Sequence, residues 1–149
     1  TSTLTEHFGD ELRLDVLERR LHDDHLARHI VLRTVSEHRP VEYGAIRIRF
    51  DGMDEEVRTK IIEGRQPLGG ILNDHRVGYR SCPGGFFKIR ATDLMADVLE
   101  LPEPAWLYGR CNCLSSAGGA NIAEVVEILP PLHSNHPTSE TSCKTTMRS

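Results

Sequence analysis

Two ionisable residues lie among apolar neighbours near opposite ends of the chain. Arg28 shares one face of an expected strand with Ile30 and Leu32, and Glu127 alternates with Val125 in a later one. An arginine keeps its charge, and desolvation raises the pKa of a carboxyl group, so each needs a partner or an anionic, protic ligand. The pair points to a small-molecule pocket. The planar fork of an arginine can hold a carboxylate, and a carboxyl group with a raised pKa is suited to proton transfer.

Periodicity alone leaves alternatives open at both ends of this pair. Ile122, Val126 and Ile128 are apolar as well, so Glu124 fits an inward position as readily as Glu127. Arg28 and Glu127 could also pair with each other as a buried salt bridge without chemistry, or one of them could lie on a sheet edge.

The elements that must position these residues alternate between strand-like and helix-like stretches. The segment Glu11–His22 fits both periods, and we favour a strand. Ala27–Val35 and Val41–Phe50 alternate clearly, and the polar residues 36–40 join them as an antiparallel hairpin. The other expected elements are helices at Asp54–Glu63 and Thr92–Leu99, a helical turn at Pro67–Leu72, and strands at Phe86–Arg90, Trp106–Leu114 and Asn121–Leu129. The order predicts an α+β fold, a mainly antiparallel sheet flanked by short helices.

Composition narrows the class of protein. The 149 residues are 38% hydrophobic with a net charge of -4, and no basic run supports binding to a phosphate backbone, so we expect no nucleic-acid partner. No apolar run approaches a membrane span and the N-terminus lacks a leader pattern, so we expect a cytoplasmic protein without membrane contact. Residues 1–131 are expected to form a single domain and the polar residues 132–149 a disordered tail. The chain opens at Thr1, so preceding residues could be missing.

Cysteines and glycines give weaker signals. The four cysteines show no metal-ligand spacing, so we expect reduced thiols and no metal. Gly118–Gly119 lies between two expected strands and predicts a hairpin turn rather than a phosphate cradle. Backbone amides at Gly69–Gly70, which follow Pro67, could face an anion.

Five segments in this order resemble the chorismate pyruvate-lyase (4-hydroxybenzoate synthase) family over residues 3–131. The likeness is carried by the ordered set: Leu4-Thr5-Glu6-His7-Phe8, Arg28-His29-Ile30-Val31-Leu32, Arg65-Gln66-Pro67-Leu68-Gly69, Tyr108-Gly109-Arg110 and Val126-Glu127-Ile128-Leu129-Pro130. The chain is also similar to shorter relatives of unassigned function and, more remotely, to the ligand-sensing domain of some transcription regulators with the same fold.

The resemblance implies an antiparallel sheet enclosing an internal pocket, and an enzyme that eliminates pyruvate from chorismate to leave 4-hydroxybenzoate, without cofactor or metal. It assigns Arg28 to a substrate carboxylate and Glu127 to the position beside the ring hydroxyl. The backbone amides of Leu4 and Leu68 would contribute to carboxylate binding. For the second carboxylate we add His75 and Arg76, which follow the Pro-Leu-Gly turn, and Gly69 completes the expected substrate contacts.

One departure from the family pattern keeps other functions open. Better-known members follow the late Gly-Arg with basic residues, whereas this chain has Cys111-Asn112-Cys113. The alternatives are a same-fold cyclase or isomerase of secondary metabolism that acts on another carboxylate or polyketide-derived substrate, and a module that binds a small carboxylate without turning it over.

Overall fold

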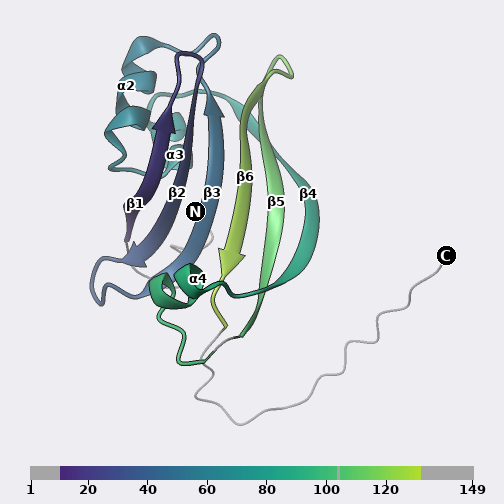
Figure 1. The fold of residues 1–149 in the computed structure, drawn as a ribbon. Helices are drawn as coiled ribbons and strands as arrows, with labels where there is room; N and C mark the ends of the chain where they lie inside the picture. Colours follow the sequence, from purple (N-terminus) through teal and green to yellow (C-terminus); the bar gives the residue numbers. More distant parts are fainter. Residues whose placement is uncertain (1–10, 104, 132–149) are drawn as a thin grey trace, which may run out of the picture.

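Six antiparallel strands form one sheet, in the order β1-β2-β3-β6-β5-β4, in the computed structural model (Figure 1). The structure describes residues 11–103 and 105–131. The strands are β1 (Leu12–Leu21), β2 (His25–Thr34), β3 (Pro40–Arg49), β4 (Tyr79–Arg90), β5 (Trp106–Ser116) and β6 (Asn121–Leu129). β3 and β6 therefore meet at the centre, which brings the first hairpin beside the last strand of the sheet.

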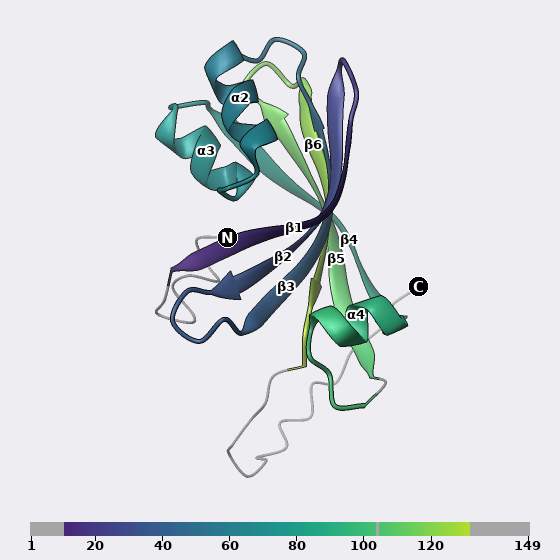
Figure 2. The ribbon, with the colours of Figure 1, turned by 60° about the vertical axis from the view of Figure 1, so that its left-hand side comes forward.

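In the described part of the chain, three short helices cover different parts of the two faces. α2 (Glu55–Glu63) and α3 (Leu68–Asp74) lie over one end of one face, and α4 (Asp93–Val98) lies over the other end of the opposite face (Figure 2). We call the first the α2/α3 face and the second the α4 face. The sheet is strongly twisted, and each helix layer covers only one end of the strands.

Two of the three apolar clusters among the described residues join the sheet to these helices. The larger apolar cluster joins the α2/α3 face to both of its helices and includes Leu26, Ile48, Val57, Ile61, Leu68, Ile71 and Leu72. A second cluster joins the α4 face to the end of α4 and includes Tyr43, Leu99, Leu107 and Ile128. α2 ends at Gly64, whose φ of 69° suits glycine and whose amide bonds the carbonyl of Ile61.

The expected antiparallel sheet with short helices is confirmed, and so is the strand preferred at Glu11–His22. β4 begins at Tyr79, earlier than the expected Phe86–Arg90. Pro83 lies within this strand. β4 is a sheet edge with a register shift between Pro83 and Gly85, and an edge tolerates a proline, which has no amide donor.

Some expectations fall outside what the structure describes. Leu4 and the tail at 132–149 belong to the residues that are not described, and the single domain over 1–131 stays a prediction. In the described part of the chain, no helix combines the length and the apolar character that a membrane crossing requires.

Gly109 marks the tightest approach within the sheet. A Cβ built on it would overlap the ring of Phe87 on β4 and would lie 2.9 Å from the backbone carbonyl oxygen of Glu127 on β6. A side chain there must therefore displace both neighbouring strands. Gly85, a glycine of β4, has no atom within 4 Å of the same built position.

We predict that Gly109→Ala lowers the free energy of unfolding by ~1–3 kcal/mol, because the added methyl group overpacks a site whose neighbours include backbone. Urea denaturation followed by circular dichroism measures the change. Gly85→Ala is the matched control and should stay within a few tenths of a kcal/mol of wild type. Equal stability of the two variants would contradict the proposed close packing.

Candidate functional site

A pocket of about 550 Å³ opens on the α2/α3 face, between the sheet and the start of α3. Its volume is within the range typical of small-molecule sites. Five strands, β2 to β6, contribute lining residues. Pro67, at the N-cap of α3, and Leu68 and Gly69, in its first turn, complete this side of the pocket. Apolar side chains such as Ile30 and Val125 form much of its surface, and a few polar groups converge on it.

Arg28 is the most deeply placed charge in this pocket. Its side chain comes from the centre of β2, and the residue is only 3% exposed. Nη1 donates a hydrogen bond to the carbonyl oxygen of Ile61 at 3.2 Å, whereas Nε is buried without a hydrogen-bond partner among the described residues. Burial lowers the pKa of Arg28 to about 10, so the guanidinium is still charged at neutral pH.

Glu127 lies in the same pocket but pairs with a different arginine. Arg110 on β5 stands directly opposite Glu127 on β6, and its Nε donates to Glu127 Oε2. This hydrogen bond and the carboxylate charge raise the pKa of Arg110. A direct Arg28–Glu127 bridge is therefore not the arrangement found, because the carboxylate is already engaged.

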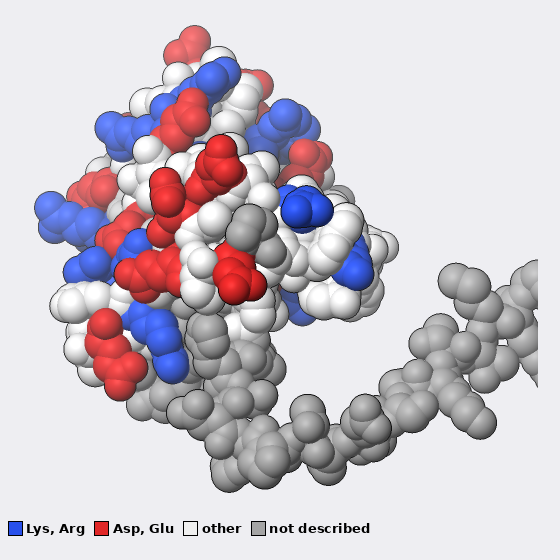
Figure 3. All heavy atoms as spheres, turned by 60° about the horizontal axis from the view of Figure 1, so that its bottom comes forward, with Lys and Arg blue, Asp and Glu red and all other residues white. Residues whose placement is uncertain are grey.

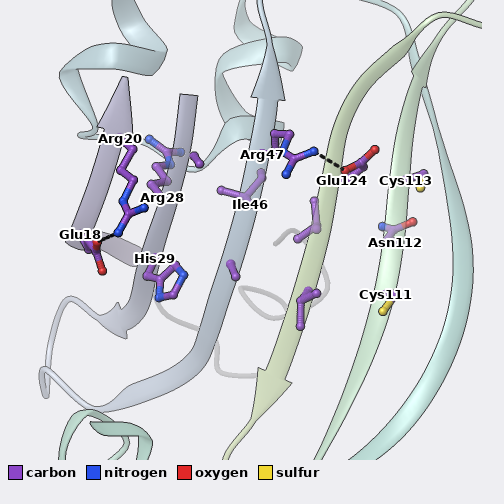
Figure 4. A pocket seen from close by; sticks show the side chains of 14 residues that line it. Glu18, Arg20, Arg28, His29, Ile46, Arg47, Cys111, Asn112, Cys113 and Glu124 are labelled. Atoms are coloured by element: carbon purple, nitrogen blue, oxygen red, sulfur yellow. Dashed lines mark hydrogen bonds and ion pairs between the residues drawn. The ribbon is translucent and has the colours of Figure 1, made fainter. Parts of the chain in front are cut away.

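The two glutamates of β6 point to opposite faces. Glu127 lines the pocket on the α2/α3 face, whereas Glu124 lines a groove on the α4 face. There a carboxylate oxygen of Glu124 lies 3.7 Å from a guanidinium nitrogen of Arg47 (Figure 4). The other oxygen lies 3.9 Å from a guanidinium nitrogen of Arg49. The structure thus answers the question that alternation left open, because the strand's face is fixed by its partners β3 and β5.

Glu42 is a pocket residue that the sequence reasoning missed. It comes from β3, is 7% exposed, and lines the pocket beside Gly44 and Ile46. Burial, followed by the nearby charge of Glu127, raises the pKa of Glu42 to about 7. Its alternation with apolar Ile46 and Ile48 was a visible signal, since it matches the pattern that singled out Arg28.

The expected contact residues divide into two groups. Leu68 and Gly69 line the pocket together with Arg28 and Glu127. His75 and Arg76 lie at the opposite end of α3, where they follow its last residue, and are not among the residues that line the pocket. Their assignment to a second carboxylate stays a prediction.

Further polar groups come from the neighbouring strands. Asn112 on β5 donates from Nδ2 to Ser81 Oγ on β4 at 2.7 Å, and both line the pocket. Tyr79 lines it as well. Within residues 11–103 and 105–131, no three His, Cys, Asp or Glu side chains gather closely enough to hold a metal ion.

The charges of this site leave one cation without a carboxylate. Arg110 is neutralised by Glu127, and Glu42 is largely protonated below its pKa of about 7. Arg28 bonds a neutral carbonyl instead. A buried guanidinium of this kind favours one anionic or hydrogen-bond-accepting group, which the pocket has room to admit.

The fold matches solved structures of bacterial proteins, some of which are named as transcriptional regulators. The chain superimposes on PhnF from Mycobacterium smegmatis with a TM-score of 0.66 and 10% sequence identity. The matched region covers 86% of this chain and 62% of PhnF. In the comparison with the separately solved effector domain of PhnF, the matched region covers 86% of each of the two chains, with the same TM-score and sequence identity. For a GntR-family transcriptional regulator from Bacillus cereus the values are a TM-score of 0.60, 12% identity, and 89% and 100% coverage. No protein-family model and no curated protein matches the chain.

These comparisons correct the expected activity. Among the structures that share this fold over most of the chain, the one from Bacillus cereus is named as a GntR-family transcriptional regulator. A Bordetella bronchiseptica structure with a TM-score of 0.61 and 16% identity is named as the ligand-binding domain of a regulator assigned to the GntR family. The prediction of a carbon-oxygen lyase that forms 4-hydroxybenzoate and pyruvate in aromatic acid biosynthesis is therefore wrong. The resemblance identified the fold and not the chemistry.

We predict that Glu42 makes folding depend on pH in the opposite sense to most carboxylates. Its pKa is raised from 4.5 to about 7 in the folded protein, so the folded state holds the proton more tightly than the unfolded state. Stability should then fall as pH rises across that interval, by on the order of 3 kcal/mol from this group. Glu42→Gln cannot ionise and should lose this component of the slope.

Urea denaturation at a series of pH values measures the effect as the difference between wild type and Glu42→Gln. Glu56→Gln, at an exposed position of α2, controls for the loss of one negative charge. If the wild-type and Glu42→Gln curves stay parallel across the whole range, the proposed coupling of Glu42 to folding is disproved.

Proposed function

We propose that this chain is the effector-binding module of a transcriptional regulator, and that it binds a small organic anion reversibly in the pocket on the α2/α3 face. The observation that carries the proposal is the buried guanidinium of Arg28, which lines the pocket with Nε unpartnered among the described residues. The likeness of the fold to regulator effector domains supports it.

The local charges define the kind of ligand. Two guanidinium groups and one carboxylate leave a single positive charge when Glu42 is protonated. A monoanionic group, a carboxylate or a phosphate diester, would compensate Arg28 without leaving a second charge unpaired. Glu42 and the Ser81–Asn112 pair could then bond hydroxyl or amide groups on the rest of the molecule.

The described surface fits a module whose contact with DNA lies elsewhere in the regulator. Acidic and basic side chains are interspersed on the end of the molecule seen in Figure 3, without a continuous basic area among the described residues. The net charge of -4 works against binding to a phosphate backbone. Because the chain spans 62% of PhnF, we assign DNA contact to a separate part of such a protein.

We predict that at least one small monoanion stabilises the protein, and that its methyl ester does not. Thermal-shift screening of small carboxylates and phosphate diesters, each paired with its uncharged methyl ester, identifies the anion, and calorimetry gives its Kd. Mass spectrometry should recover the bound compound unchanged, as expected of a module that does not catalyse. Equal binding of acids and esters would disprove the anion site.

Arg28→Lys should weaken that binding by about tenfold or more, since a lysine keeps the charge but lacks the planar fork. Arg47→Lys is the matched control, because Arg47 pairs with Glu124 on the opposite face. Circular dichroism confirms that both variants are folded. Unchanged affinity in a folded Arg28→Lys variant would place the ligand elsewhere.

A further inference from the structure

Three cysteines gather on the half of the sheet formed by β4 and β5. Cys111 and Cys113 lie two residues apart on β5 and line the groove on the α4 face (Figure 4). Cys82 lies on β4 directly opposite Cys113 in the strand register. All three are free thiols in the structure, with Cys82 and Cys111 exposed and Cys113 half-buried.

The register brings Cys82 and Cys113 within reach of each other. Directly opposed residues in an antiparallel pair have Cβ atoms about 4.5–5.5 Å apart and project from the same face. A disulfide requires Cα atoms about 4.4–6.8 Å apart and Cβ atoms about 3.5–4.5 Å apart, so a small approach of the two strands is sufficient. The pair therefore needs no refolding of the sheet.

Two neighbouring features make that approach feasible. One residue away on the other face, Asn112 Nδ2 bonds Ser81 Oγ at 2.7 Å, so the strands are already held closely in this register. On the other side of Cys82 the register shifts between Pro83 and Gly85, and such a bulge gives the edge strand freedom to adjust.

Cys111 has no equivalent partner among the described residues. Gly85 stands opposite it in the register, and the Cβ built on Gly84 would lie 3.6 Å from the Cβ of Cys111. A glycine supplies no sulfur, and neighbouring cysteines on one strand face are about 7 Å apart along the backbone. Cys111 is thus a built-in control for the pair.

We propose that Cys82 and Cys113 form an oxidisable thiol pair that a low-molecular-weight disulfide such as glutathione disulfide converts into a cross-strand disulfide. The exposed Cys82 thiolate attacks one sulfur of the oxidant, a new sulfur–sulfur bond forms, and one glutathione thiolate leaves. Cys113 then attacks the Cys82 sulfur of this mixed disulfide and expels the second glutathione. Two protein thiols are oxidised and one glutathione disulfide is reduced to two glutathione molecules.

The bond would join the edge strand β4 to β5 behind the pocket. Ser81 and Asn112, which line the pocket, are the sequence neighbours of the two cysteines. The covalent link also closes the chain segment that contains α4. Cross-linking these residues restricts the unfolded chain, so oxidation should raise the Tm.

The experiment oxidises the full chain with glutathione disulfide, blocks the remaining thiols by alkylation, and maps disulfides in non-reduced proteolytic peptides. We expect loss of two of the four thiols, a peptide linking Cys82 to Cys113, and a rise in Tm that dithiothreitol reverses. Cys111→Ser should behave as wild type, and Cys82→Ser should lose both the linked peptide and the rise in Tm.

Three results would overturn the proposal. In the first, glutathione stays bound to Cys82 while Cys113 can still be alkylated. In the second, the disulfide contains Cys111 or Cys143 in place of Cys82 or Cys113. In the third, the disulfide forms only between separate chains. A Cys111→Ser variant that no longer forms the bridge would count equally against it. Each result is read from the peptide map, which does not depend on knowing the ligand.

Discussion

The burial of one guanidinium organises this molecule. Arg28 comes from the centre of β2, where water cannot solvate its charge, and its Nη1 bonds the carbonyl of Ile61 in the last turn of α2. Arg19 of β1 donates to the next carbonyl, that of Ile62, at 2.8 Å. Two cations thus meet the negative end of the α2 dipole, which stabilises the helix on the sheet. Nε of the same guanidinium is buried without a hydrogen-bond partner among the described residues, and Arg28 lines the pocket, so one side chain both anchors α2 and contributes to the site.

The twist of the sheet explains why a pocket survives beside this helix. α2 and α3 cover only one end of their face, and α4 covers the other end of the opposite face. The strands therefore continue past α3 with polar residues on the α2/α3 face, where Glu42, Arg110 and Glu127 lie. Gly44 lines the pocket without a side chain, and a Cβ built there would lie 3.2 Å from the side chain of Ile30. A wider helix layer would have filled this space with apolar side chains.

Period-two alternation was enough to predict most strands and to place Arg28 inward, because both are local properties of the chain. Alternation could not decide between Glu124 and Glu127, because β6 has apolar residues on both faces. It also could not predict that Arg110 neutralises Glu127, because that pairing depends on the β5–β6 register. Glu42 was missed for a different reason. Its alternation with apolar residues is visible in the sequence, but its raised pKa of about 7 comes from burial and from the charge of Glu127, which only the fold provides. The early start of β4 depended on its being an edge, which is a property of the whole sheet.

The charged residues of the pocket explain why the family resemblance identified the fold but not the activity. Elimination of pyruvate from chorismate requires a site for two carboxylates, and a dry pocket must offer a cation to each. Among the described residues that line this pocket, Arg28 is the one cation without a carboxylate partner, because Arg110 is held by Glu127. Where the family pattern has further basic residues after the late Gly-Arg, Asn112 bonds Ser81 and brings no charge. A site with one uncompensated cation and a neutralised ion pair suits the retention of a single anionic group, which is the property an effector-binding module needs.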